Sequence, residues 1–239
     1  MRSNSPVRIC ILPKLSGVGG MVSFQHKFSQ GLQNRGIQVC FDLSDEPYQA
    51  VLVIGGTRKL AGLWRARRKG IPVVQRLDGM NWLHRLREPA LPKESLSIRR
   101  LKHFVRAEYG NFILAMLRSR LASVIVYQSE FVRRWWQDKY GLASANSPVI
   151  YNGVDLNTYT PSAASARPSD TWRLLMVEGS LMGGYEHGLQ AAMGLVESLA
   201  AFPEVNQLPI ELMIAGRVSE NIKDRSEERR VGKECRSRW

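Results

Sequence analysis

The sequence predicts an α/β protein built on a parallel β-sheet, with helices covering both faces of the sheet. Short runs rich in Val, Ile and Leu alternate along the chain with longer segments whose apolar residues recur every three or four positions. Several of the short runs end in loops that contain glycine, as strands do at the ligand-binding edge of a parallel sheet. Hydrophobic residues make up 44% of the 239 residues, which is ordinary for a soluble globular protein. Alternation of strand and helix predicts parallel pairing, because each helix carries the chain back to the start of the next strand.

The expected strands are short apolar runs bounded by turn residues. They lie at 7–12, 37–42, 50–56, 71–79, 122–129 and 148–151, and then at 172–179 and 210–216. The expected helices carry apolar residues at helical spacing, as Met21, Phe24 and Phe28 do. They lie at 21–35, 57–69, 98–116, 130–140 and 188–202, and a long loop is expected at 81–94.

A stretch rich in Ser, Ala and Pro separates two series of strands and helices. Such a composition is typical of a linker. The sequence therefore predicts an N-terminal domain at 1–156, a linker at 157–170 and a second domain that begins at 171 and runs to 224.

The last fifteen residues, RSEERRVGKECRSRW, do not resemble the rest of the chain. They fit one reading frame of a common sequencing-library adapter that begins AGATCGGAAGAGC, so we expect 225–239 to be a non-native tail. The alternative is a basic C-terminus that binds nucleic acid. The net charge is +13, and without the tail 28 basic and 18 acidic residues remain, a net charge of +10. This balance favours an acidic partner such as a nucleotide, a membrane surface or nucleic acid.

Three scattered cysteines form neither a disulfide framework nor a zinc-binding pattern, which favours a reducing compartment. Cys10 and Cys40 lie in apolar strand-like runs and are expected to be core residues. No apolar window is long enough for a transmembrane helix, and the N-terminus lacks the features of a secretory signal. We therefore expect a cytoplasmic protein.

The loop SGVGG follows the first expected strand and leads into a helix. Glycine allows backbone amides to approach an anion, and the positive N-terminus of a helix favours one. Gly17 and Gly19 fit the first two positions of a dinucleotide-binding motif, but the third position is Val22. A Rossmann-type nucleotide-cofactor enzyme with Asp42 on the ribose is one alternative, and a plain tight turn is another.

The segment RLDGMNW ends the fourth expected strand. Asp78 stands where a carboxylate could act as a base or bind a hydroxyl group, and Arg76 could pair with it or with a phosphate. Trp82 could stack on a sugar ring. The alternative is a structural Arg–Asp pair at a strand end, beside a surface aromatic residue. His84 lies deeper in the loop and is more typical of a bystander.

In the segment VIYNGVDLNTYTP, a sharp turn and a carboxylate precede the expected linker. Asn152 and Gly153 tolerate positive φ, so the chain is expected to reverse there. Asp155 is expected to cap the following turn through an Asx hydrogen bond.

Two expected helices combine basic and aromatic residues, in the segments RRLKHFVRAEY and FVRRWW. One interpretation is a solvated helix face with aromatic residues in the core. The other is peripheral contact with an anionic membrane, where Lys and Arg are attracted and Trp lies among the headgroups. No nucleic-acid-binding signature is present, so we expect no nucleic acid partner. A basic, non-catalytic binding module for an anionic membrane or nucleic acid is an alternative to an enzyme.

Three motifs, in their order along the chain, resemble glycosyltransferase family 4. They are GVGGM after the first strand, YQSEFV before a helix, and above all VIYNGVDLNTYTP. The resemblance covers nearly all of 7–217 and implies a GT-B fold, with a complete N-terminal, acceptor-side Rossmann-like domain followed by a Rossmann-like donor-binding domain. The segments WRLLMVEGS, GYEHGLQAAMGLVESL and LPIELMIAG look like the first βαβ unit of that second domain.

The resemblance implies transfer of a sugar from a nucleotide sugar to a carbohydrate or lipid-linked acceptor, with retention at the anomeric carbon. The nucleotide sugar is a substrate, so no cofactor is implied. No metal is implied either, in keeping with the lack of an Asp-x-Asp motif. The residues that match family positions are Gly19, Gly20, Ser180 and His187 for the donor and its phosphates, Asp78 for catalysis, Arg76, Gly79 and Trp82 for the acceptor side, and Asn152, Gly153 and Asp155 for the hinge.

This chain departs from the family pattern in two loops and in its extent. The reaction-centre loop reads Arg-Leu-Asp where many members have a His or a His-Asp pair. Ser180 and His187 stand where members usually hold the donor phosphates with an Arg and a Lys. The family's paired glutamates, E-x7-E, lie well beyond the second strand of the donor domain. We therefore expect 171–224 to be a truncated donor domain and this chain to be an incomplete, inactive fragment.

Overall fold

The computed structural model describes residues 6–17, 19–82, 85, 98–160, 172–180, 186–202 and 210–217. The chain divides into two compact units, Met1–Gly153 and Val154–Trp239, and each unit is described by itself. The expected tail at 225–239, His84 and most of the expected linker lie outside the described residues.

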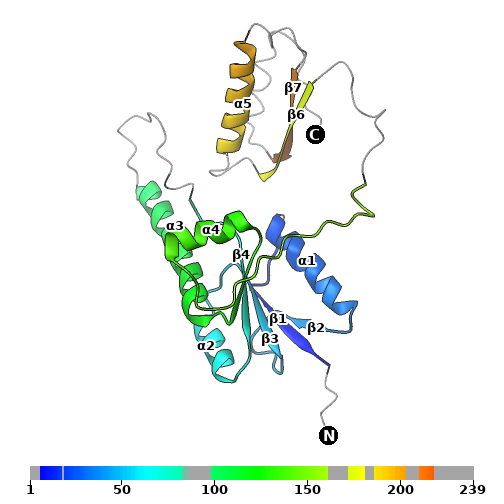
Figure 1. Cartoon of the computed structure of the whole chain (residues 1–239), viewed down its shortest axis with the longest axis vertical. Helices are drawn as coiled ribbons and strands as arrows, with labels where there is room; N and C mark the ends of the chain where they lie inside the picture. The colour runs from blue at the N-terminus through cyan, green and yellow to red at the C-terminus, as the bar shows by residue number, and fades with distance from the viewer. Residues whose placement is uncertain are drawn as a thin grey trace. The chain divides into compact units, whose positions relative to one another are not determined.

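The first unit contains a five-stranded parallel sheet (Figure 1). Its strands are β1 (Arg8–Leu12), β2 (Gln38–Cys40), β3 (Ala50–Ile54), β4 (Val73–Leu77) and β5 (Val124–Tyr127). The strand order is β2-β1-β3-β4-β5, and every neighbouring pair is parallel. This sheet confirms the predicted α/β fold class.

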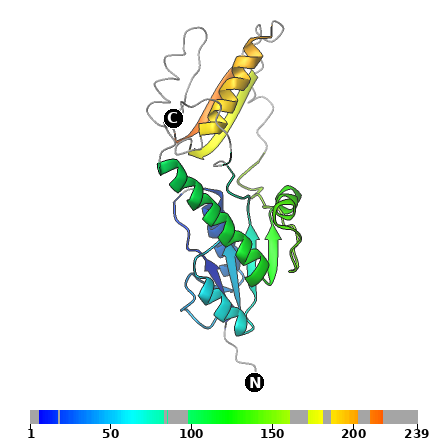
Figure 2. The ribbon, with the colours of Figure 1, turned by 90° about the vertical axis from the view of Figure 1, so that its left-hand side faces the viewer.

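Helices cover both faces of this sheet. Successive residues of a strand point to opposite faces, so an apolar strand needs a covering layer on each side. On one face, Ile11, Leu52 and Ile54 pack against Phe24 and Phe28 of α1 (Gly20–Gln33). On the other face, the core joins the strands to α2 (Leu60–Arg68), to α3 (Ile98–Met116) and to a π-helical turn, η3 (Leu117–Leu121). Figure 2 shows α3, in green, running along the sheet. The result is three layers, helix on sheet on helix.

Helix α4 (Glu130–Tyr140) closes the β5 end of the sheet and has the bounds that the sequence predicts. It begins at Ser129, whose Oγ accepts a hydrogen bond from the backbone N–H of Val132, as an N-cap does. The Trp136 side chain is fully buried against Leu77, Ile125 and Tyr127. Trp136 is therefore a core residue and not a membrane anchor, which corrects one interpretation of FVRRWW.

The expected strand at 148–151 is wrong in its extent. Val149 forms only an isolated parallel bridge with Tyr127, and Asn146 forms another with Val124. The carbonyl oxygen of Pro148 accepts a hydrogen bond from Tyr127 N at 3.0 Å. Ile150 N donates in return to Tyr127 O at 2.9 Å, but Pro148 has no N–H of its own, so the ladder is interrupted there.

The second helix begins later than the sequence predicts, at Leu60 instead of Thr57. The Thr57 hydroxyl oxygen accepts a hydrogen bond from the backbone N–H of Lys59 at 3.2 Å. This local turn competes with helix formation, as threonine side chains often do at the ends of helices.

The second unit contains a parallel βαβ unit, as the sequence predicts. It consists of β6 (Trp172–Ser180), α5 (Glu186–Ala200) and β7 (Ile210–Arg217). Gly216 has φ +157°, and a Cβ built there would lie 2.2 Å from the carbonyl oxygen of Glu178. The close approach of these two strands therefore requires glycine at this position.

Candidate functional site

The strand order of the first unit places its ligand-binding edge. The chain continues to β2 on one side of β1 and to β3 on the other, so a topological switch point lies between β1 and β3. Open parallel sheets bind ligands outside the carboxyl ends of their strands at such points. The loops that begin after β1, β3, β4 and β5 all leave from this edge.

A buried ion pair lies at the carboxyl end of β4. Arg76 Nη1 donates to Asp78 Oδ1 at 3.0 Å, and Arg76 Nη2 donates to Asn152 Oδ1 at 2.8 Å. The guanidinium carbon of Arg76 lies 3.8 Å from the ring centre of Phe24 on α1. The Arg76 side chain is 7% exposed, so its charge is held by Asp78, Asn152 and an aromatic face. The sequence prediction that Arg76 pairs with Asp78 is confirmed.

Gln128 and Asn152 complete this network from β5 and from the chain beyond α4. Asn152 Nδ2 donates to Gln128 Oε1 at 2.9 Å, and the Gln128 side chain also hydrogen-bonds to Asp78. Burial raises the pKa of Asp78 above its usual value, although Arg76 and the Gln128 hydrogen bond both lower it. Burial also lowers the pKa of Arg76, which the charge of Asp78 opposes. The Asp78 side chain keeps 28% exposure, so it can still accept a hydrogen bond from a ligand hydroxyl.

The loop after β4 is fixed by groups that the sequence analysis did not identify. Trp136 Nε1 donates to the carbonyl oxygen of Asp78 at 2.8 Å. Buried Asn111, on α3, accepts from Asn81 N and donates to Asn81 O, both at 2.9 Å. A Cβ at Gly79 would lie 2.9 Å from Cζ3 of Trp135, so this position requires a small residue. These contacts fix the backbone around Asp78, whereas the Trp82 side chain is exposed.

The glycine loop leads directly into α1. Gly17 and Gly19 have positive φ values of 95° and 142°, and Gly20 is the first residue of the helix. Among the described residues, no side-chain hydrogen bond caps the N-terminus of α1. Buried Gln25 closes the loop, because its Nε2 donates to Pro13 O at 2.7 Å and its Oε1 accepts from Leu15 N at 2.8 Å. A polar residue on the inward face of an amphipathic helix was the signal that could have identified Gln25.

The segment around Asn152 differs from its sequence prediction. Gly153 does not have positive φ, and no turn forms at Asn152 and Gly153. The Asn152 side chain is instead held by Arg76 and Gln128, which keeps the backbone beside β5. The turn comes next, where Asp155 Oδ1 accepts from Asn157 N at 3.0 Å and Asp155 Oδ2 accepts from Thr158 Oγ1 at 2.7 Å. The expected Asx hydrogen bond of Asp155 is therefore confirmed.

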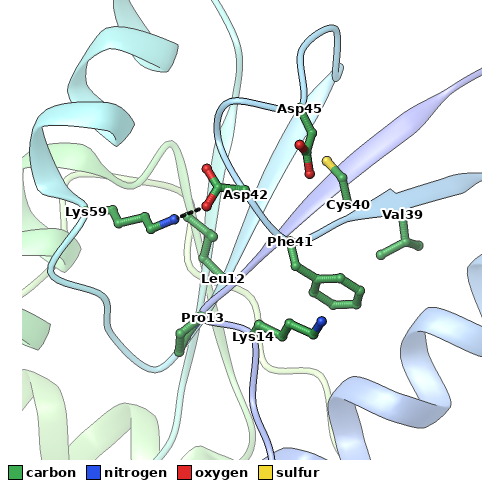
Figure 3. A pocket seen from close by; sticks show the side chains of 9 residues that line it. All are labelled: Leu12, Pro13, Lys14, Val39, Cys40, Phe41, Asp42, Asp45 and Lys59. Atoms are coloured by element: carbon green, nitrogen blue, oxygen red, sulfur yellow. Dashed lines mark hydrogen bonds and ion pairs between the residues drawn. The ribbon is translucent and has the colours of Figure 1, made fainter.

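A separate depression of about 570 Å³ lies at the carboxyl ends of β1 and β2 (Figure 3). Its lining residues are Leu12, Pro13, Lys14, Val39, Cys40, Phe41, Asp42, Asp45 and Lys59. The Asp42 carboxylate is already occupied by Lys59 Nζ at 2.5 Å and by the N–H and hydroxyl of Ser44 at 3.0 Å each. The hydrogen bond from Lys59 is the main cause that lowers the pKa of Asp42 to about 2. A ribose hydroxyl would have to displace these partners.

The predicted phosphate-binding residues of the second unit lie at the expected backbone positions. Ser180 is the last residue of β6, and His187 is the second residue of α5. Their side chains lie outside the described part of the chain. They therefore remain predictions.

Comparison with known proteins identifies the region that contains the Asp78 network. Residues 52–158 match the family model described as Glycosyltransferase Family 4, and no curated protein matches the chain. Within the described residues, no helix has the length and apolar character needed to cross a membrane.

The solved structures that resemble this chain include three at 13–18% identity. MurG from Acinetobacter baumannii has a TM-score of 0.49 at 14% identity, with 93% of this chain and 62% of that chain covered. HepE from Anabaena, solved with UDP and glucose, has a TM-score of 0.48 at 18% identity, with 93% and 64% covered. UDP-N-acetylglucosamine 2-epimerase from Rickettsia bellii has a TM-score of 0.41 at 13% identity, with 98% and 69% covered. The chain thus spans about two thirds of the length of each. The family model that matches residues 52–158 is thus the model of the family that the sequence motifs resemble.

Proposed function

We propose that this chain is part of a retaining glycosyltransferase that moves a sugar from a nucleotide-sugar donor to a carbohydrate or lipid-linked acceptor. The observation that carries the proposal is the network of Arg76, Asp78, Gln128 and Asn152, which lies at the ligand-binding edge inside the family region. A fixed carboxylate with a side-chain amide beside it suits the recognition of hydroxyl groups on a sugar. The strongly basic chain suits a donor that carries phosphates.

In this proposal Asp78 accepts a hydrogen bond from the acceptor hydroxyl and orients its oxygen. The bond from the anomeric carbon to the donor phosphate breaks, the bond to the acceptor oxygen forms, and the hydroxyl proton passes to the Asp78 carboxylate. Arg76 is a positioning residue, because it is buried and reaches the acceptor only through Asp78 and Asn152. Trp82, exposed beyond Gly79, provides a surface on which a sugar ring can stack.

The donor side of the proposal rests on the glycine loop and on the second unit. Gly19 and Gly20 would offer backbone amides to the donor phosphate, and Ser180 and His187 stand at the family's phosphate-binding positions in the second unit. We also propose that this chain turns over little sugar by itself. A donor needs groups on both sides to be held in reactive geometry, and the described second unit contributes one βαβ unit.

The test is ligand binding by the full chain, measured by saturation-transfer difference NMR with a panel of nucleotide sugars and oligosaccharides. Asp78→Asn keeps the shape of the residue but removes its charge, and Asp42→Asn makes the same change in the other depression. We expect Asp78→Asn to weaken oligosaccharide binding at least about tenfold, the range of one charged hydrogen bond, and Asp42→Asn to leave it unchanged. The opposite pattern, with binding of a nicotinamide or adenosyl cofactor, would favour the Rossmann-type alternative.

The gene sequence beyond the codon for Asp224 tests the fragment prediction. A continuation with further strands, helices and an E-x7-E pair would support a transferase, and the longer product should then be assayed for transfer. Retention is tested by comparing the anomeric configuration of donor and product by NMR. A true stop codon after Trp239 would favour the non-catalytic binding module.

Helix α3 supports a second candidate function, peripheral contact with an anionic membrane. Leu101, Val105 and Phe112 lie on one exposed stripe of the helix, with exposures of 65%, 58% and 60%. Lys102 and Arg106 are exposed beside that stripe. Apolar residues flanked by cations are typical of a helix that lies at a membrane surface.

Vesicle co-sedimentation separates this function from the first. We expect the chain to bind vesicles that contain phosphatidylglycerol, and to lose this binding with Phe112→Ser or Lys102→Glu. Leu142→Ser removes an apolar residue outside α3 that is even more exposed, at 83%, and is the control. Equal binding to neutral phosphatidylcholine vesicles, or equal loss with Leu142→Ser, would contradict a role for α3.

A further inference from the structure

The two cysteines of the first unit lie side by side in the sheet. Cys10 of β1 and Cys40 of β2 are direct register partners on neighbouring parallel strands. Both side chains belong to the core cluster on the α2 and α3 face of the sheet. The two thiols are close enough that each affects the pKa of the other. The sequence places these residues thirty positions apart, so only the strand pairing brings them together.

This arrangement suits a covalent bond between the two sulfur atoms. Neighbouring strands lie about 4.8 Å apart, and disulfides join Cα atoms separated by about 4.4–6.8 Å. Because both side chains point to the same face, the sulfur atoms can meet without reversal of either strand. We propose that Cys10 and Cys40 are a redox modification site, at which a small-molecule disulfide such as oxidised glutathione produces a reversible Cys10–Cys40 disulfide. The proposal does not rest on the proposed function.

Access to the pair is from the side of Cys40. Cys10 is fully buried, whereas Cys40 keeps 8% exposure and lines the depression of Figure 3 beside Phe41 and Asp45. Cys40 also lines a second depression, with Gly36 and Gln38. A small disulfide can therefore reach the sulfur of Cys40 first, and Cys10 can react only with a group already attached to Cys40.

The reaction proceeds in two exchange steps. The Cys40 thiolate attacks one sulfur of oxidised glutathione, the glutathione S–S bond breaks, and one glutathione thiolate leaves. Cys10 then attacks the Cys40 sulfur, its proton passes to the departing glutathione sulfur, and the second glutathione leaves as a thiol. One molecule of oxidised glutathione is reduced to two thiols, and two protein thiols are oxidised to one disulfide. Reduced glutathione reverses both steps.

The chemical surroundings make this exchange slow. Burial is the main cause that raises the pKa of both thiols, that of Cys10 to about 12. The carboxylates of Asp42 and Asp45 raise both values further, and Arg8 opposes them at Cys40. Because a raised thiol pKa leaves little thiolate, the pair should exchange slowly.

The bond would fix the edge of the sheet. Strand β2 has three residues and lies at the edge, with β1 as its neighbour in the sheet. The segment enclosed by Cys10 and Cys40 contains the glycine loop and α1. A disulfide would therefore link the two strands, β1 and β2, that flank this segment. Closing a loop of this length restricts the unfolded chain, so the oxidised protein should be the more stable form.

The experiment uses the full chain with Cys235→Ser, so that two thiols remain. It is equilibrated with mixtures of reduced and oxidised glutathione, quenched with acid and mapped by mass spectrometry without reduction. We expect a peptide pair that joins Cys10 to Cys40 and is two hydrogens lighter than the reduced pair. The effective concentration of one thiol for the other should be at least tenfold higher in the native protein than in 8 M urea.

The matched controls are Cys10→Ala and Cys40→Ala on the same background, with folding checked by circular dichroism. Cys10→Ala should stop at a glutathione adduct on Cys40, whereas Cys40→Ala should remain unmodified because Cys10 is buried. The melting temperature of the oxidised parent should rise by about 5 °C or more. A native effective concentration no higher than that in urea, or modification of Cys10 before Cys40, would overturn the proposal.

Discussion

The two units share the strand–helix–strand plan but bury their strands very differently. In the first unit, Ile11, Val51 and Val53 are completely buried between helices. In the second, Trp172, Leu175 and Val177 of β6 are 64–66% exposed, although WRLLMVEGS is as apolar as many core strands. Among the described residues of the second unit, Leu189 is the one buried hydrophobic residue.

The difference shows that burial depends on the number of neighbours a strand has. Strands β1, β3 and β4 each have a strand on either side and helices on both faces. The described β6 has one neighbouring strand, β7, and packs against one helix, α5. A hydrophobic strand therefore contributes far more to stability in the first unit than a similarly apolar strand does in the second. The contribution is proportional to the apolar area removed from water.

The largest expected effect compares two tryptophans. Trp136→Ala should lower the free energy of unfolding of the first unit by about 3–5 kcal/mol, because it empties a large core site and removes the hydrogen bond to Asp78 O. Trp172→Ala should change stability by less than about 0.5 kcal/mol, the range of surface substitutions. Urea unfolding followed by far-UV circular dichroism measures both. Equal losses would contradict the contrast between the units.

The next effect compares two ion pairs. Arg76→Ala leaves Asp78 largely buried without its cation, and we expect a loss of about 2 kcal/mol, less than for a fully buried pair because Asp78 is partly exposed. Arg173→Ala in the second unit breaks an exposed pair with Glu211, and we expect a loss below about 1 kcal/mol. The double variant Arg76→Ala, Asp78→Ala should recover part of the first loss. No recovery would show that Arg76 acts through packing on Phe24.

Two glycines give opposite signs. Gly79→Ala places a methyl group against the Trp135 ring, and we expect a loss of about 1–2 kcal/mol from overpacking. Gly194 lies within α5 with open space at its Cβ, so Gly194→Ala should stabilise the second unit by about 0.5–1 kcal/mol through helix propensity. Thermal melts of the two variants provide the measurement, and a loss with Gly194→Ala would indicate a contact at that surface.

The smallest expected effect is a pH dependence, and it sharpens the contrast between buried and exposed groups within the first unit. The pKa of Asp78 is raised above 3.8 in the folded state. Its contribution to stability is therefore fully present below that value and is lost as the pH rises through the folded pKa. The pKa of Asp42 is lowered to about 2. Its contribution is present above 3.8 and is lost as the pH falls toward about 2.

Carboxyl carbon NMR titration of the two residues measures these shifts directly. The unfolding free energies of Asp78→Asn and Asp42→Asn, relative to the parent, should change in opposite directions as the pH rises from 3 to 6. The same direction for both variants would show that Asp78 is not governed by burial.

Much of the fold was predictable from the sequence, because helices and strands each have a characteristic spacing of apolar residues that is visible within a short stretch of chain. The bounds of α4 were predicted to the residue, since Ser129 caps its start and Gly141 follows its end. The βαβ unit of the second part was predicted in the same way. The strand at 148–151 and the turn at Gly153 were wrong, because Pro148 and the side-chain bonds of Asn152 prevailed over local preference.

What the sequence determined by itself is the series of elements, their parallel pairing, and the motifs that resemble glycosyltransferase family 4. Tertiary structure alone decided which side chains meet: Arg76 with Asn152, Gln25 with the glycine loop, and Cys10 with Cys40. The physical reason is that the spacing of apolar residues and the preferences of turn residues act between positions that are close in the sequence. Strand register joins residues dozens of positions apart, and it is set by packing of the whole sheet against its helices.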